Sequence, residues 1–175
     1  MAGRLAKPKV KVMDKAERQR RIEAVLRKAR NCYVKIGLKD AGDVYPTQGE
    51  NAQPVTVGQV GAWMEFGTHS KAGIEMVPAR SFLRTPVDNG MKTINRVRVQ
   101  QIDRIIQGET GIAQGLEAIG AKVQLLVQNA MTRGIRPRLA KSTLKKKRAL
   151  GQPDTPLIAT KFSFDHIGFE VVLNR

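Results

Sequence analysis

Two histidines and one cysteine are the side chains of this chain best suited to metal binding or nucleophilic chemistry. Neither His69 nor His166 has a second His, Cys or carboxylate at metal-ligand spacing. Glu65 and His69 can be drawn as an acid–base pair, but one such pair arises easily by chance. Cys32 has apolar neighbours and no activating partner, which favours a small, buried, inert thiol. We therefore predict no catalytic residue, no metal site and no cofactor, and a protein that is not an enzyme.

Charge is the bulk property that most restricts function. Lysine and arginine number 31 against 15 acidic residues, a formal net charge of +16 in 175 residues. This balance indicates acidic partners, either nucleic acid or acidic proteins. Residues 40–54, in contrast, carry three acidic residues and no base. The bases most exposed to partners are expected in an N-terminal arm and in a later basic run, namely Arg4, Lys7, Lys9 and Lys11, and then Arg136, Arg138, Lys141, Lys145, Lys146, Lys147 and Arg148.

The length of the chain predicts one domain, able to bury about two-thirds of its unfolded surface. No stretch approaches the roughly 20 apolar residues that span a bilayer, and no apolar stretch follows the N-terminal charges as in a secretory signal. We expect no membrane contact. The predicted organisation is a basic flexible arm at residues 1–12 and a single α+β domain at 13–175, with a basic connector at 135–156 inside it.

Apolar residues at helical spacing predict four main helices, at residues 14–30, 57–66, 87–107 and 112–133. Asp14 and Thr56 stand where N-caps are expected, and Gly108 and Gly134 stand where the two long helices should end. The basic segment 142–150 is expected to form one or two further helical turns. The two long helices, joined by a short turn, predict an antiparallel pair packed on a sheet.

Alternation of apolar and polar residues predicts strands at 33–38 and near the C-terminus, at 169–174. Residues 39–54 and 68–77 are expected to be loops. The predicted fold class is α+β, with a small mixed or antiparallel sheet packed against the two long helices, an extended basic N-terminal arm and long loops. The residues expected to be buried between helix and sheet are Leu116, Ile119, Val123 and Leu126.

Residues 78–86 are predicted to form a short helical turn, because proline is favoured at the start of a helix. On such a turn Phe82 and Leu83 anchor the segment to the body, while Arg80 and Arg84, four residues apart, point together along another side. A rigid guanidinium pair suits bidentate capture of carboxylates on a neighbouring subunit. The alternative is that both arginines are simply solvated. The predicted interface therefore combines the basic residues above with Glu65, Phe66, Arg80, Phe82, Leu83 and Arg84.

Two short motifs in this region resemble the signature of the tail-completion, or neck, proteins of long-tailed bacteriophages. They are Glu65-Phe66-Gly67-Thr68 and, after a loop, Pro78-Ala79-Arg80-Ser81-Phe82-Leu83-Arg84. The family usually has a proline where this chain has Ser81. Later residues follow the family's order as well, with Lys161 where glycine is usual, and they are Pro137, Ser142-Thr143-Leu144, Lys147, Gly151 and Pro156-Leu157-Ile158-Ala159-Thr160.

The resemblance implies a structural virion protein that forms a ring, sixfold in the family, between head and tail. The implied partners are other copies of the chain, a head–tail adaptor, tail tube or terminator proteins and, non-specifically, the passing DNA. Location in the virion neck or tail follows, after assembly in the host cytoplasm. The charge alone supports an alternative, a basic nucleic-acid-binding module. Against it, the basic run lacks stacking aromatics, and the chain lacks helix-turn-helix or zinc-finger spacing.

Overall fold

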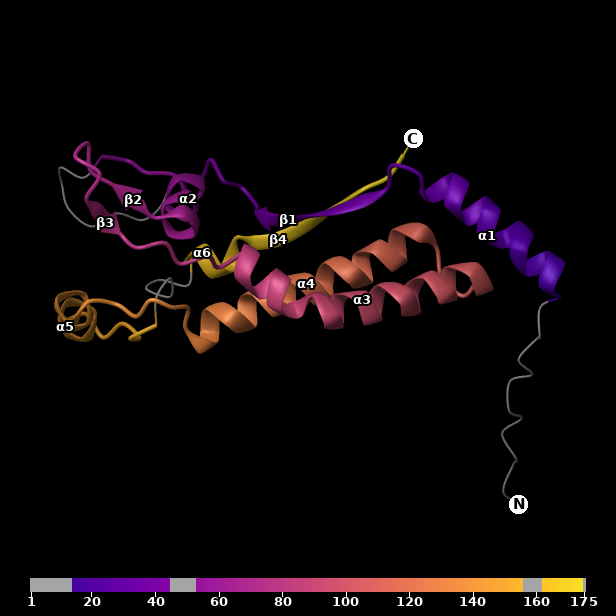
Figure 1. Ribbon diagram of the computed structural model, residues 1–175. Helices are drawn as coiled ribbons and strands as arrows, with labels where there is room; N and C mark the ends of the chain where they lie inside the picture. Colours follow the sequence, from indigo (N-terminus) through magenta and orange to yellow (C-terminus); the bar gives the residue numbers. More distant parts are fainter. Residues whose placement is uncertain (1–13, 45–52, 156–161, 175) are drawn as a thin grey trace, which may run out of the picture.

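The computed structural model describes residues 14–44, 53–155 and 162–174, which form an α+β fold (Figure 1). The predicted fold class is confirmed. The N-terminal arm with Arg4, Lys7, Lys9 and Lys11 lies outside the described residues. In chain order the elements are α1 (Lys15–Ala29), β1 (Tyr33–Leu38), α2 (Val57–Phe66), β2 (Thr68–His69), β3 (Glu75–Val77), α3 (Arg84–Gln107), α4 (Ile112–Arg133), α5 (Lys141–Ala149), α6 (Phe162–Asp165) and β4 (Ile167–Val172).

The main sheet joins the two strands that the alternation of residues predicted. β1 pairs antiparallel with β4, so that Tyr33 lies opposite Val172 and Leu38 lies opposite Ile167. α4 packs on this sheet, and α3 packs along α4, as Figure 1 shows. Among the described residues, this sheet has two strands. Its narrow surface explains why, of the four residues expected to be buried, Val123 is buried whereas Leu116, Ile119 and Leu126 are half-buried.

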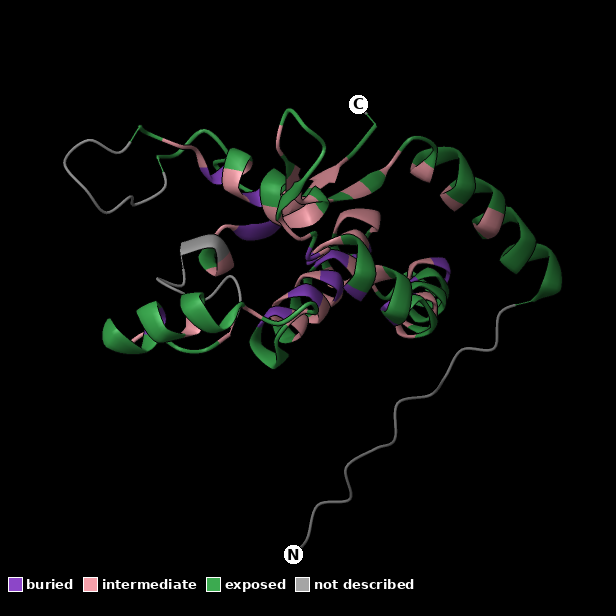
Figure 2. Ribbon diagram, turned by 60° about the vertical axis from the view of Figure 1, so that its left-hand side comes forward, coloured by how far each residue is buried: buried purple, intermediate pink, exposed green. Residues whose placement is uncertain are grey.

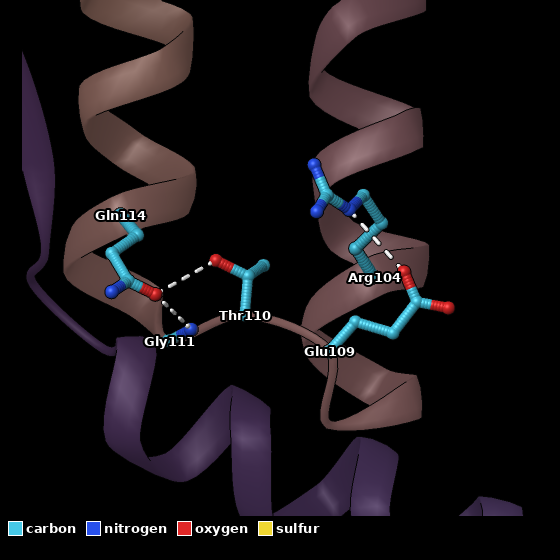
Figure 3. A network of polar contacts seen from close by, with 5 residues as sticks. All are labelled: Arg104, Glu109, Thr110, Gly111 and Gln114. Carbon is cyan, nitrogen blue, oxygen red and sulfur yellow. Dashed lines mark hydrogen bonds and ion pairs between the residues drawn. The ribbon is translucent and has the colours of Figure 1, made fainter.

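Glycines and polar side chains end the long helices as expected. Gly108, with a φ of 78°, ends α3, and Gly134 follows α4. In the turn between them, Gln114 Oε1 accepts hydrogen bonds from the amide of Gly111 at 3.1 Å and the hydroxyl of Thr110 at 3.0 Å (Figure 3). These bonds satisfy groups that the start of a helix leaves without an intrahelical partner. The antiparallel pair is therefore fixed by its own short turn.

The core lies where α4, β4 and the segment before α3 meet. Its buried cluster consists of Phe82, Val127, Met131 and Ile167. Leu83 is among the half-buried residues packed against this cluster. Phe82 is 1% exposed, so the prediction that it anchors this segment is confirmed.

The short helix α2 is held close to β1 by its glycines. Thr56 caps it through a reciprocal pair of bonds with Gln59, which confirms the expected start. A Cβ on Gly61 would overlap the side chain of Leu38, and one on Gly58 would lie 3.0 Å from the Ala41 carbonyl oxygen. The elements that approach these two glycines closely are therefore β1 and the turn after it.

Several local predictions are wrong. Residues 78–83 are not helical, and α3 begins only at Arg84. Residues 68–77 form the β2–β3 hairpin instead of a loop. Cys32 is half-buried, because its sulfur lies at the edge of the fold beside the Asn174 amide. Asp14 occupies the N-cap position of α1 but makes no side-chain capping bond.

Candidate partner-binding site

The two halves of the motif touch each other through Glu65. Its carboxylate accepts hydrogen bonds from the hydroxyl of Ser81 at 2.7 Å, the amide of Leu83 at 3.0 Å and the amide of Arg84 at 3.2 Å. The amides at the start of a helix lack intrahelical partners, and a negative charge there matches the helix dipole. Glu65 therefore caps α3 from the neighbouring helix α2, and among the described residues its carboxylate bonds to these groups and not to the arginine side chains of the motif.

Arg80 is buried, with 5% of its surface exposed. Its Nε donates to the Pro137 carbonyl at 2.9 Å and its Nη2 donates to the Arg138 carbonyl at 3.4 Å. Burial lowers the pKa of Arg80, and the charge of Glu75 opposes that shift. The guanidinium thus ties the segment before α3 to the start of the connector. The prediction that Arg80 points outward is wrong, because its guanidinium donates to the backbone carbonyls of Pro137 and Arg138, which lie 57 and 58 positions away in the sequence.

Arg84 and Phe66 remain on the surface. The guanidinium of Arg84 lies over the Phe66 ring, with 6.0 Å between its carbon and the ring centroid. A cation in this position is attracted by the negative face of the ring. Phe66 is 64% exposed. Arg84 therefore does not pair with Arg80, and the two motif residues that present surface to a partner are an arginine and the aromatic ring beneath it.

A groove runs beside the contact between Arg84 and Phe66, where α3, α4 and the connector meet. It consists of two adjoining cavities, of about 550 Å³ and 630 Å³, which share the wall from Arg133 to Arg136. The first lies between α3 and α4 and is lined by hydroxyl and amide side chains at helical spacing, namely Ser81, Thr85, Asn89 and Thr93 on one side and Asn129 on the other. The second extends toward α5. We call the two together the basic groove.

Arginines give the basic groove its charge. Within the described part of the chain, no hydrogen bond or ion pair engages the guanidinium of Arg133, Arg136 or Arg138, and all three residues are exposed. Arg148 pairs with Asp154, with 2.6 Å between Nη2 and Oδ2, and this bond lowers the pKa of the Asp154 carboxyl. The groove therefore offers excess positive charge beside uncharged hydrogen-bonding groups, which suits an anionic ligand that also has polar groups.

The residues of the predicted basic run differ in their exposure. Lys141, Lys145 and Lys146 are exposed on α5. Lys147 is 8% exposed, and its Nζ donates to the Thr155 carbonyl at 2.7 Å, so its predicted role in contacting a partner is wrong. Arg133 lines both cavities but was not among the predicted interface residues. A signal for the groove was available in the polar residues at 85, 89 and 93, since a four-residue spacing places them along one face of α3, whereas Ser81 lies in the non-helical segment before this helix.

The residues considered for chemistry do not converge. His166 Nε2 lies 3.3 Å from Asp43 Oδ2, a pair 123 positions apart that the sequence did not suggest. In the described ranges, no three His, Cys, Asp or Glu side chains gather to hold a metal ion. In the same ranges, no helix has the length and apolar character needed to cross a membrane.

Comparisons of the chain with family models, with curated proteins and with solved structures return no match. The resemblance to phage neck proteins therefore rests on the motifs themselves, and the function has to be argued from the contacts they make.

The first prediction concerns the carboxylate that joins the motif halves. We expect Glu65→Gln to lower the free energy of unfolding by about 1–2 kcal/mol, because the amide keeps one acceptor oxygen but loses the charge at the start of α3. Urea unfolding followed by circular dichroism measures this. The matched control is Glu117→Gln, an exposed site on α4, expected to stay within about 0.5 kcal/mol of the unsubstituted protein. Equal effects at the two sites would contradict the capping role.

Proposed function

We propose that this protein is a structural subunit of a bacteriophage neck, which forms a ring that completes the tail and joins it to the head. One observation carries the proposal: the residues that resemble the family signature form one connected unit. Glu65 links α2 to α3, Arg80 links the same segment to the connector, and Phe82 fixes that segment in the core. A motif that holds three elements together is expected of a framework shared by a family of assembly proteins.

The arrangement of surfaces supports the same proposal. A ring built from identical contacts needs two different faces on each subunit, and additional surface for the proteins above and below. Exposed apolar side chains and the basic groove supply such surfaces on this chain. The partners proposed are other copies of the chain, six in a ring by analogy with the family, together with a head–tail adaptor and a tail tube or terminator protein. The proposed location is the virion neck or tail, after assembly in the host cytoplasm.

Within this proposal, the basic groove receives an acidic segment of a flanking protein. Arg133 and Arg136 supply the charge, and amides such as Asn89 and Asn129 supply hydrogen bonds to an extended chain. Charge pairs at an exposed rim contribute more to the rate of encounter and to specificity than to affinity. The groove therefore orients the flanking protein, while apolar contacts elsewhere hold the ring.

The proposal is tested by assembly. Purified protein is measured by light scattering and negative-stain electron microscopy, alone and after addition to tails assembled without it. Ring-shaped particles and restored joining of tails to heads are the expected results. A chain that stays monomeric at every concentration, and also fails to bind tails or restore joining, would overturn the proposal.

The groove also favours a second candidate, a nucleic-acid-binding module. The exposed lysines of α5 extend the positive surface beyond the arginines, and phosphate groups suit both. Such binding weakens steeply with salt, since about 0.9 counterions are released for each phosphate that is neutralised. A fluorescent DNA duplex is titrated with the protein at salt concentrations between about 50 and 200 mM, the range over which such binding is largely lost. A steep loss of affinity with salt would favour nucleic-acid binding over recognition of a protein.

The second prediction concerns the groove arginines. We expect the double substitution Arg133→Gln, Arg136→Gln to weaken binding to tails about two- to thirtyfold, because each of two exposed charge pairs contributes about 0.2–1 kcal/mol. The free energy of unfolding should change by less than about 0.5 kcal/mol, since both side chains are exposed. Co-sedimentation with tails measures the binding.

The matched control for the groove is Arg96→Gln, Arg98→Gln, which removes the same charge from exposed positions on α3 outside the groove lining. If the control weakens binding as much as the groove variant, the effect is net charge alone and the groove has no specific role. In the nucleic-acid alternative, the groove variant should instead reduce the logarithmic salt slope of DNA binding by about two.

A further inference from the structure

Helix α1 stands apart from the body of its own chain. None of its 15 residues is buried, and in Figure 2 it shows only exposed and half-buried positions. Its attachment to the rest of the fold includes a bond from Arg21 Nη1 to the Gln107 carbonyl at 3.3 Å, at the end of α3. Isolated helices of about 15 residues are marginal in water, so α1 needs more packing than its own chain supplies.

The helix nevertheless has an apolar stripe. Ile22, Val25, Leu26 and Ala29 recur at helical spacing, and Leu26 is 66% exposed while the other three are half-buried. This stripe is the pattern of a helix that packs against a hydrophobic surface. The apolar contacts that this stripe lacks in the described part of its own subunit have to come from another surface.

A matching apolar surface lies at the opposite end of the molecule. Four large side chains there are exposed: Trp63 at 41%, Phe66 at 64%, Ile74 at 65% and Met76 at 67%. They belong to α2 and to the β2–β3 hairpin with its turn. The hairpin follows α2 directly after Gly67, and the amide of Arg80, in the segment that follows β3, donates to the Met64 carbonyl of α2 at 2.6 Å. We call this surface the α2–hairpin patch.

The two surfaces cannot meet within one subunit. Figure 1 places α1 at one end of the elongated fold and α2 with the hairpin at the other end. A contact between different surfaces at opposite ends is heterologous, and repetition of such a contact closes into a ring when the rotation between subunits allows it.

Charge complements the apolar match. α1 carries six basic residues against two acidic ones. Residues 40–77, which include α2 and the hairpin, carry five acidic residues and one lysine, in a chain whose net charge is +16. Of these acids, Asp40 and Asp43 are exposed in the turn that leads toward α2. Opposite charges around an apolar contact fix its register and speed association.

We infer that α1 of one subunit docks on the α2–hairpin patch of the next copy of the same chain, and that this contact is the repeating interface of the ring. The inference rests on the proposed function, which it deepens by naming the two surfaces. Leu26 is the central apolar contact of the helix, and the bases flanking the stripe face the acidic turn of the neighbour.

Cysteine cross-linking tests the pairing directly. In a Cys32→Ser background, Leu26→Cys and Met76→Cys are placed in the same chain and joined with a bismaleimide. A head-to-tail contact predicts a ladder of covalent multimers from this double variant. A mixture of the two single variants should yield covalent dimers only, and each single variant alone should yield none. The control double variant pairs Leu26→Cys with Val99→Cys, at an exposed apolar site on α3, and should give no ladder.

A second measurement keeps folding separate from assembly. We expect Leu26→Glu to shift the ring toward monomers by at least tenfold in association constant, with the melting temperature of the monomer unchanged, because the Leu26 side chain is 66% exposed in its own subunit. Val99→Glu is the control and should leave both quantities unchanged. Rings that persist with Leu26→Glu, or dimers cross-linked from Leu26→Cys alone, would overturn the inference.

The outcomes also distinguish this inference from the proposed function. Rings that form normally without a cross-linked ladder would refute the docking of α1 on the α2–hairpin patch but leave the neck assignment standing. A chain that forms no ring, alone or on tails, would refute the neck assignment and the docking together.

Discussion

Phe82→Ala is expected to lower the free energy of unfolding by about 3–5 kcal/mol, the usual loss when a fully buried aromatic ring is truncated. The ring is 1% exposed and belongs to the buried cluster formed with Val127, Met131 and Ile167. These partners come from α4 and β4, so the resulting cavity would lie where the helical layer meets the sheet. Urea unfolding monitored by circular dichroism measures the change.

Phe66→Ala is the matched control, since Phe66 is the phenylalanine of the other motif half and is 64% exposed. Its loss should cost less than about 1 kcal/mol, mainly through the contact with the Arg84 guanidinium. Similar losses at the two sites would mean that Phe82 does not occupy the core as described. A large loss of stability at Phe82, together with a Phe66→Ala variant that stays stable but assembles poorly, would separate the structural half of the motif from its surface half.

The elements that sequence predicted well are those specified by local signals. Thr56 and Gln59 form a reciprocal cap three residues apart, and Gly108 ends α3 in the left-handed conformation that glycine favours. The strand at 33–38 was likewise visible in its alternating residues, although the residues it pairs with lie 129 to 139 positions away. Signals of this kind need no knowledge of the tertiary fold.

The segment before α3 could not be predicted in the same way. Proline at 78 favours a helix start locally, but Glu65 takes the amides of Leu83 and Arg84, which places the start of α3 at Arg84. The cap comes from a different helix, so no short-range rule indicates it. Tertiary hydrogen bonds overrode a weak local preference here.

The candidate site likewise combines features that local sequence indicates with features that depend on tertiary contacts. The excess of bases after residue 132 was evident, yet burial of Lys147 depends on the Thr155 carbonyl lying above α5. The groove itself requires α3 and α4 to be adjacent, because its polar lining is contributed by both. Composition therefore indicated the charge of the site, whereas its shape and the residues that face a ligand depend on long-range packing.

Arg80→Ala is expected to lower the free energy of unfolding by about 2–4 kcal/mol, because it removes a buried, charged donor and its two hydrogen bonds to backbone carbonyls. The affected carbonyls belong to Pro137 and Arg138, so the loss should also release the connector from the body. Urea unfolding measures the stability, and hydrogen exchange of the α5 amides measures the release. Arg80→Lys should recover only part of the loss, since an ammonium cannot reproduce the planar fork that reaches two carbonyls.

Arg84→Ala is the control for this substitution, because its exposed guanidinium makes only the contact with Phe66 described above. It should change stability by less than about 1 kcal/mol. The comparison decides between two roles for Arg80. If Arg80→Ala unfolds like the unsubstituted protein yet fails to assemble, the guanidinium acts on a neighbouring subunit after all. If instead Arg80→Ala loses stability and frees α5 while Arg84→Ala does neither, Arg80 acts inside the subunit. There it maintains the shape of the basic groove, because it fixes the connector that forms one wall of the groove.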